Sequence, residues 1–120
     1  MTKIAIVDDE LEILKVLERA LQKDFQVQTF SNPINAFNEI VQGKFDLVLS
    51  DIMMPQLDGL SLLKQLRSHN CNVMVIMMTA FDSLDKALEA HKYGAKNYIK
   101  KPFKSMEDVR KIVFNEITND

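Results

Sequence analysis

The sequence contains few of the residues that mark secreted, fibrous or membrane proteins. Its 120 residues include one cysteine, three glycines, three prolines and no tryptophan. Because Cys71 has no partner within the chain, a disulfide scaffold is excluded and a reducing cytoplasm is expected. No hydrophobic run approaches the roughly 18 residues that a membrane span needs, and the short apolar run after Lys3 is no signal peptide.

Charge and composition also limit the class of protein. Fifteen basic residues are balanced by seventeen acidic ones, and the basic residues form no long run. We therefore expect no direct binding of nucleic acid by this chain. With 120 residues, of which 47% are hydrophobic, the chain is large enough to bury a core. We expect one domain over residues 1–120 with no second domain.

Short apolar runs alternate with segments of helical periodicity along the whole chain. Strands are expected at 4–7, 26–30, 47–49, 73–78 and 97–100, with a helix after each strand. The apolar positions of these helices include Val16, Ile34 and Leu88. This alternation predicts an α/β fold in which a parallel sheet of five strands is covered on both faces by five helices. The pattern resembles the flavodoxin-like doubly wound fold, which implies the strand order 2-1-3-4-5.

Capping residues indicate where several helices begin. Asn32 followed by Pro33 is typical of a helix start. Asp9 with Glu12 three residues later resembles a capping box, so Asp9 has a structural interpretation as a cap. Ser83 is expected to cap the helix that follows it.

Asp51 is the residue that most needs an explanation, because it ends a strand expected to be buried on both faces. A lone carboxylate in such a place is costly. In a doubly wound sheet, ligands bind beyond the carboxyl ends of the strands, at the switch in strand order. The polar residues expected at those ends are Asp8, Asp9, Asp51, Thr79 and Lys101.

Three carboxylates in one pocket require compensation. Two like charges about 4 Å apart repel by roughly 4 kcal/mol at an effective dielectric constant near 20. The candidate ligands are all hard oxygens without a histidine–cysteine cluster, which favours Mg²⁺, or Mn²⁺, over zinc. A lysine ammonium and a threonine hydroxyl are suitable partners for a phosphoryl group, so the set predicts a phosphoryl-transfer site with a carboxylate nucleophile.

These residues and the motifs around them resemble the receiver domains of response regulators in two-component signalling, over essentially the whole chain. The matching motifs are Asp8-Asp9-Glu10, Asp51 with Met54-Pro55 and Asp58-Gly59, Thr79-Ala80, and Lys101-Pro102-Phe103. The resemblance implies that Asp51 accepts a phosphoryl group from a phosphohistidine on a sensor histidine kinase or phosphotransfer protein. The chain would then be a phosphoacceptor that assists its own phosphorylation and slow autodephosphorylation, and not an enzyme.

The resemblance also implies a ligand set and a conformational switch. Asp8, Asp9, Asp51 and the backbone carbonyl of Met53 would hold Mg²⁺. Lys101 would contact the phosphoryl group, and its peptide bond to Pro102 would be cis.

On phosphorylation, Thr79, which precedes the small Ala80, would move toward the phosphoryl group and Tyr98 would rotate inward. The surface formed by the helix after Ser83, the strand at 97–100 and the last helix would change, to control a C-terminal output domain or a separate partner. A homodimer through this surface is compatible with the family. Met53 and Phe81 would hinder the hydrolytic water, which predicts slow loss of phosphate.

Three alternatives use the same architecture. An FMN-binding flavodoxin would need a Ser/Thr/Gly-rich loop where this chain has Asp8-Asp9-Glu10. A haloacid-dehalogenase-type phosphatase would place Asp-x-Asp after its first strand, but here the two aspartates are adjacent. The third alternative is an interaction domain of the same fold that is never phosphorylated.

Overall fold

The computed structural model describes residues 1–119, except for the side chain of Phe81. One parallel sheet has the order β2-β1-β3-β4-β5. Its strands are β1 (Lys3–Val7), β2 (Gln26–Phe30), β3 (Leu47–Asp51), β4 (Met74–Thr79) and β5 (Asn97–Lys100). The helices are α1 (Leu11–Leu21), α2 (Pro33–Ile40), α3 (Gly59–Ser68), α4 (Leu84–Ala90) and α5 (Met106–Thr118), and the 3₁₀ turns η1 (Phe81–Ser83) and η2 (His91–Tyr93) flank α4. The predicted fold class and strand order are confirmed.

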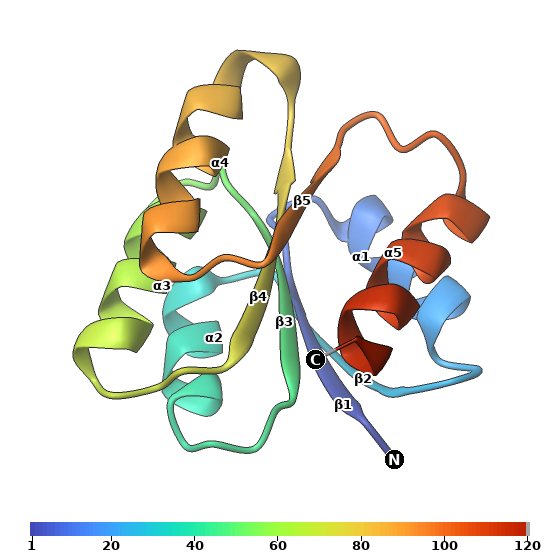
Figure 1. Ribbon diagram of the computed structural model, residues 1–120, viewed down its shortest axis with the longest axis horizontal. Helices are drawn as coiled ribbons and strands as arrows, with labels where there is room; N and C mark the ends of the chain where they lie inside the picture. The colour runs from blue at the N-terminus through green and yellow to red at the C-terminus, as the bar shows by residue number, and fades with distance from the viewer. Residues whose placement is uncertain (120) are drawn as a thin grey trace.

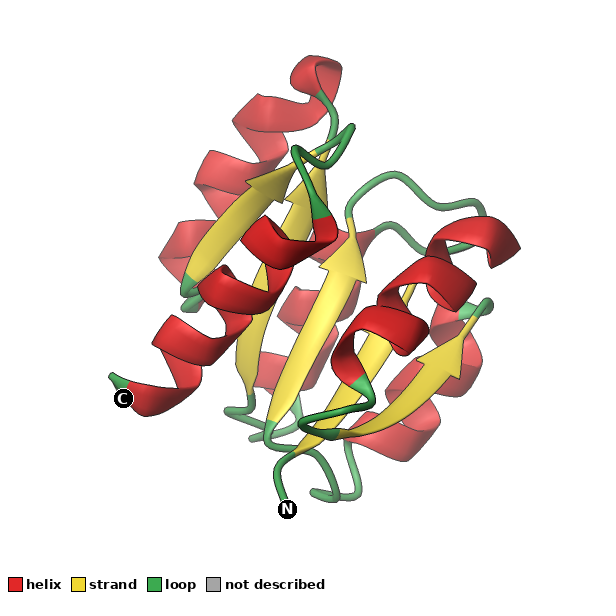
Figure 2. Cartoon of the chain, turned by 90° about the vertical axis from the view of Figure 1, so that its right-hand side faces the viewer, coloured by secondary structure: helices red, strands yellow, loops and turns green. Residues whose placement is uncertain are grey.

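Helices cover both faces of the sheet. Figure 1 shows α2, α3 and α4 on one side and α1 and α5 on the other. In Figure 2, seen from the α1 and α5 side, the strands run in one direction behind these helices. Val48 packs in the core on the α2–α4 side, whereas Leu47 and Leu49 pack in the core on the α1–α5 side. The non-alternating apolar sequence of β3 follows from this burial on both faces.

The predicted caps have mixed outcomes. The side chain of Asn32 accepts hydrogen bonds from two backbone amides at the start of α2, as predicted. The capping-box interpretation of Asp9 is wrong, because Glu10 is the N-cap of α1 and no side chain caps that helix. Ser83 is the N-cap residue of α4, as predicted, but its side chain makes no capping hydrogen bond to that helix.

Parts of the predicted helical faces are also wrong. Val16, Ile34 and Leu88 are 44%, 50% and 59% exposed. In α1, the buried face follows Leu14 and Leu17 instead. The rotation of a helix about its axis determines which residues face the sheet and are buried. An apolar residue next to the buried stripe can therefore remain exposed. Within the described residues, no helix has the length and apolar character needed to cross a membrane.

Candidate functional site at the carboxyl ends of the strands

The parallel sheet gathers polar side chains from four strands at one edge. Asp8 follows β1, Asp51 ends β3 and Thr79 ends β4. Lys101 follows β5, and its backbone amide donates a hydrogen bond of 2.8 Å to the carbonyl of Thr79. Because the strands are parallel and in register, side chains more than 90 residues apart in sequence meet at this edge.

Lys101 is the cation at the centre of this group. Its Nζ lies 2.6 Å from Asp8 Oδ2, 3.4 Å from Asp51 Oδ1 and 3.9 Å from Glu10 Oε1. Asp8 is fully buried and Asp51 is 6% exposed. The Asp8 carboxylate also accepts a 2.9 Å hydrogen bond from the Glu10 amide, and Asp51 accepts one of 3.0 Å from the Ile52 amide. Each buried carboxylate therefore has the Lys101 ammonium and a backbone amide as partners.

These partners do not fully compensate Asp51. Burial is the largest cause that raises the pKa of Asp51, and repulsion from Asp8 is the next. The attraction of Lys101 lowers this pKa, but the balance leaves it at about 6. Desolvation alone would lower the pKa of Lys101, but its contacts with Asp8 and Asp51 raise it on balance. The site thus has one cation for two buried carboxylates, and a second cation would favour the ionised form of Asp51.

Asp8, Asp9 and Asp51 form a cluster that can hold a metal ion. Each residue offers one carboxylate oxygen, and the three oxygens lie within 4.8 Å of one another. Asp9 is exposed, so the cluster opens to solvent on its side. Carboxylate oxygens are the donors that Mg²⁺ and Mn²⁺ prefer, and the negative charge left over after pairing with Lys101 suits a divalent cation.

A cleft of about 250 Å³ lies beside this cluster. The described residues that line it are Glu10, Asp51, Met53, Ala80, Asp82, Ser83 and Lys101. Met53 is 52% exposed, and its sulfur lies 3.8 Å from the ammonium of Lys86 on α4. The side chain of Phe81, predicted to flank the same route for water, lies outside the described residues.

Thr79 is at the site by position, but its hydroxyl is engaged in the turn that follows β4. The residue is 1% exposed. Its Oγ1 lies 2.8 Å from the hydroxyl of Ser83 and 3.0 Å from the carbonyl oxygen of Ala80. Sequence analysis missed Ser83 as a site residue, since a serine before a helix indicates a cap and nothing more specific.

Gly59 fixes the backbone behind Asp51. Its amide donates a 2.7 Å hydrogen bond to the carbonyl of Ile52. A Cβ at this position would overlap with the carbonyl oxygen of Asp51. Asp58-Gly59 is one of the motifs that carry the resemblance, but the close approach to Asp51 is visible only in the structure.

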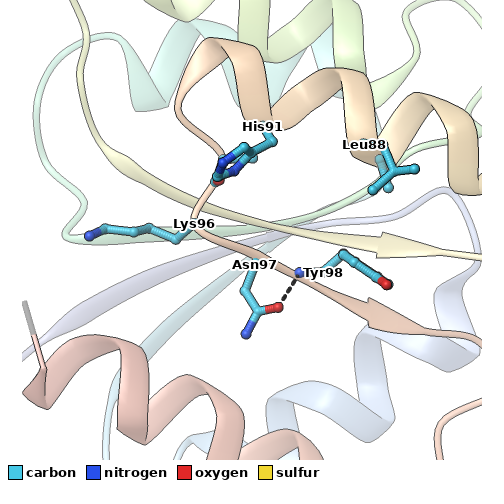
Figure 3. Close-up of a pocket in the computed structure, with 7 residues that line it drawn as sticks. Leu88, His91, Lys96, Asn97 and Tyr98 are labelled. Atoms are coloured by element: carbon cyan, nitrogen blue, oxygen red, sulfur yellow. Dashed lines mark hydrogen bonds between the residues drawn. The ribbon is translucent and has the colours of Figure 1, made fainter.

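Pro102 directly follows Lys101, whereas Tyr98 lies on β5 apart from the carboxylate cluster. The peptide bond between Lys101 and Pro102 is cis. Tyr98 is half-buried on β5 and lines a cavity of about 180 Å³ between β5 and α4, together with Leu88 and His91 (Figure 3). The structure therefore brings Asp8, Asp9, Asp51 and Lys101 together, whereas Tyr98 lies against α4.

Comparison with known proteins assigns a family to this geometry. The family model described as the response regulator receiver domain matches residues 4–114. The chain belongs to the response regulator receiver family. It is 42% identical over 99 residues to the DNA-binding transcriptional regulator NtrC of Escherichia coli, in a match that covers 82% of this chain and 21% of NtrC.

Solved structures of receiver domains have the same fold. The response regulator receiver domain protein of Clostridium thermocellum has a TM-score of 0.87 at 30% identity, covering 99% of this chain and 96% of that one. A CheY-like receiver domain protein of Methanospirillum hungatei has a TM-score of 0.90 at 26% identity, covering 99% and 95%. The receiver chain spans about a fifth of the length of curated relatives such as NtrC.

Proposed function

We propose that this receiver domain accepts a phosphoryl group on Asp51 in the presence of Mg²⁺. The observation that carries the proposal is the pairing of the Lys101 ammonium with both Asp8 and Asp51 at the end of β3. The Asp51 carboxylate lines the cleft, so an incoming phosphoryl group can reach it. The resting ion pairs hold the lysine where it can also contact that group.

Asp8, Asp9, Asp51 and the backbone carbonyl of Met53 would hold the Mg²⁺ ion. Bound Mg²⁺ supplies positive charge to the phosphoryl oxygens as negative charge develops on them. Mn²⁺ suits the same oxygen donors. The carboxylate cluster, whose oxygens lie within 4.8 Å of one another, supports this assignment.

The transfer needs little more than positioning. An Asp51 oxygen forms a bond to phosphorus, while the bond from phosphorus to the imidazole nitrogen of a donor phosphohistidine breaks and the imidazole leaves. Lys101 would neutralise the added charge, and the Thr79 hydroxyl would donate a hydrogen bond to a phosphoryl oxygen. The donor would be a sensor histidine kinase or a phosphotransfer protein. The domain is then a phosphoacceptor that assists this step and the slow hydrolysis of its own aspartyl phosphate, and not an enzyme acting on other substrates.

The output of the switch would pass through α4, β5 and α5. Tyr98 lines the cavity between β5 and α4, so its inward rotation would change this face. The face would control a C-terminal output domain or a separate protein, or form a homodimer. NtrC is named as a DNA-binding transcriptional regulator, which supports a transcriptional output and a cytoplasmic location.

Labelling by acetyl phosphate tests the proposal. The wild-type chain should gain one phosphoryl group only when Mg²⁺ is present, as measured by intact mass spectrometry. Asp51→Asn should abolish the gain. Asp46→Asn is the matched control, because Asp46 is an exposed aspartate just before the opposite end of the same strand, and it should label normally. Undiminished labelling of Asp51→Asn, or none of the wild type, would leave an interaction domain that is never phosphorylated.

A further inference from the structure

The hydroxyl of Thr79 belongs to a closed group of three oxygens. Thr79 Oγ1 and Ser83 Oγ lie 2.8 Å apart, Thr79 Oγ1 lies 3.0 Å from the Ala80 carbonyl oxygen, and Ser83 Oγ lies 3.2 Å from the same oxygen. Thr79 and Ser83 are 1% and 3% exposed. Water therefore has little access to either hydroxyl, and each hydroxyl donates its hydrogen bond to another oxygen of this group.

Counting protons shows how the group is held. Two hydroxyl protons are shared among three oxygens, and the carbonyl can only accept. Thr79 can donate to the carbonyl while Ser83 donates to Thr79, or Thr79 can donate to Ser83 while Ser83 donates to the carbonyl, or both hydroxyls can donate to the carbonyl, which has two lone pairs. In all three arrangements the Thr79 proton stays inside the turn formed by residues 79–83. It is not available to a phosphoryl oxygen on Asp51.

We propose that Ser83 is a positioning residue that holds the Thr79 hydroxyl away from the phosphoryl site until Asp51 is phosphorylated. This inference rests on the proposed function of Asp51. Ser83 has a second property that suits the role, since it can keep the Ala80 carbonyl as its acceptor after Thr79 leaves. When Thr79 leaves, the buried hydroxyl of Ser83 still has the Ala80 carbonyl as a partner. The hydrogen bond between Thr79 and Ser83 therefore opposes the movement of Thr79 but does not prevent it.

The size of the effect follows from one hydrogen bond. A typical net hydrogen bond changes an equilibrium by about 2-fold to 10-fold. In Ser83→Ala, Thr79 keeps only the carbonyl of Ala80 as a partner, and its departure becomes easier by about that factor. Mg²⁺ binding alone should be unchanged, because Ser83 contributes no oxygen to the cluster of Asp8, Asp9 and Asp51.

Beryllofluoride is the probe, because with Mg²⁺ it forms a carboxylate-bound mimic of a phosphoryl group. Its affinity for the full chain would be measured by calorimetry at a fixed Mg²⁺ concentration. Ser83→Ala should bind it about 2-fold to 10-fold more tightly than the wild type. Ser83→Thr, which keeps the hydroxyl, should return to the wild-type affinity. Ser68→Ala is the matched control, since it removes an exposed serine hydroxyl that bonds Gln65 and His69 at the C-terminal end of α3, and it should change nothing.

A double-mutant cycle separates this role from a general loosening of the turn. In the Thr79→Ala background, Ser83→Ala should give no further gain, because Ser83 acts through the Thr79 hydroxyl. An equal gain in that background, or no gain in the wild-type background, overturns the inference. If Ser83→Ala does not fold, Ser83→Cys is the second variant. Because a thiol is a weaker donor than a hydroxyl, Ser83→Cys should bind beryllofluoride more tightly than the wild type, by a smaller factor than predicted for Ser83→Ala. An unchanged affinity of Ser83→Cys would also overturn the inference. Failure of wild-type labelling by acetyl phosphate would instead refute the proposed function itself, and the role of Ser83 with it.

Discussion

Replacing the carboxylate of Asp51 by a neutral amide should make the metal-free domain more stable. Asp51 is buried beside Asp8, and its pKa is raised from 3.8 to about 6. At neutral pH the folded protein therefore holds an ionised carboxylate that it disfavours. Asp51→Asn has nearly the same shape and cannot ionise, so it removes this unfavourable term.

The magnitude follows from the shift. A rise of about 2 pKa units corresponds to roughly 3 kcal/mol, at about 1.4 kcal/mol for each unit. The sign is set by proton binding: between pH 4 and pH 6 the folded state binds more protons than the unfolded state, so stability falls as the pH rises through this window. The variant should gain almost nothing below pH 4 and about 3 kcal/mol above pH 7.

Urea unfolding in EDTA at a series of pH values between 4 and 8 measures this difference. Glu12→Gln is the matched control, because Glu12 is an exposed carboxylate on α1, and its variant should stay within about 0.5 kcal/mol of the wild type. Mg²⁺ should stabilise the wild type more than Asp51→Asn, since binding to the folded state adds to its stability. A variant less stable than the wild type at pH 7.5, or a gain independent of pH, would refute the electrostatic reasoning.

Three further variants address other parts of the site. Lys101→Met should destabilise the metal-free fold by about 3 kcal/mol in urea unfolding, because it leaves buried carboxylates without their cation, and Mg²⁺ should restore part of the loss. Gly59→Ala should cost about 1–3 kcal/mol or more in the same assay, since its methyl group would overlap with the carbonyl of Asp51. Met53→Asn combined with Phe81→Glu should shorten the lifetime of the phosphorylated form, followed by loss of the added mass, and an unchanged half-life would contradict a role for these two side chains in excluding water.

The sequence predicted the sheet and the convergence of charges for the same physical reason. Buried parallel strands have continuous apolar sequences, so β3 is recognisable without its neighbours. Once the strands are parallel, their carboxyl ends must share an edge, and the positions of Asp8, Asp51 and Lys101 follow. The 2.6 Å contact between Lys101 and Asp8 spans 93 residues, yet strand order alone places the two residues at one edge.

Features that depend on the rotation of a helix or the shape of a turn could not be predicted in this way. Leu88 is apolar and lies at helical spacing, but it is 59% exposed beside the cavity that Tyr98 lines. Ser83 precedes a helix, as a cap does, but the 3₁₀ turn η1 directs its hydroxyl back to Thr79. The local sequence shows which side chains can form hydrogen bonds, but the backbone geometry over several residues determines which partner each one reaches.

The two ends of α4 are attached to the rest of the domain in different ways. Near its C-terminal end, Lys64 pairs with Glu89 at 3.3 Å, and Arg67 donates a 2.8 Å hydrogen bond to the carbonyl of Tyr93. Both contacts come from α3 and involve neither Thr79 nor the acidic cluster. The N-terminal end is joined to β4 through the hydroxyls of Thr79 and Ser83. A change of partner at Thr79 would therefore release one contact at the beginning of α4, whereas the contacts from α3 near its C-terminal end do not depend on that hydroxyl.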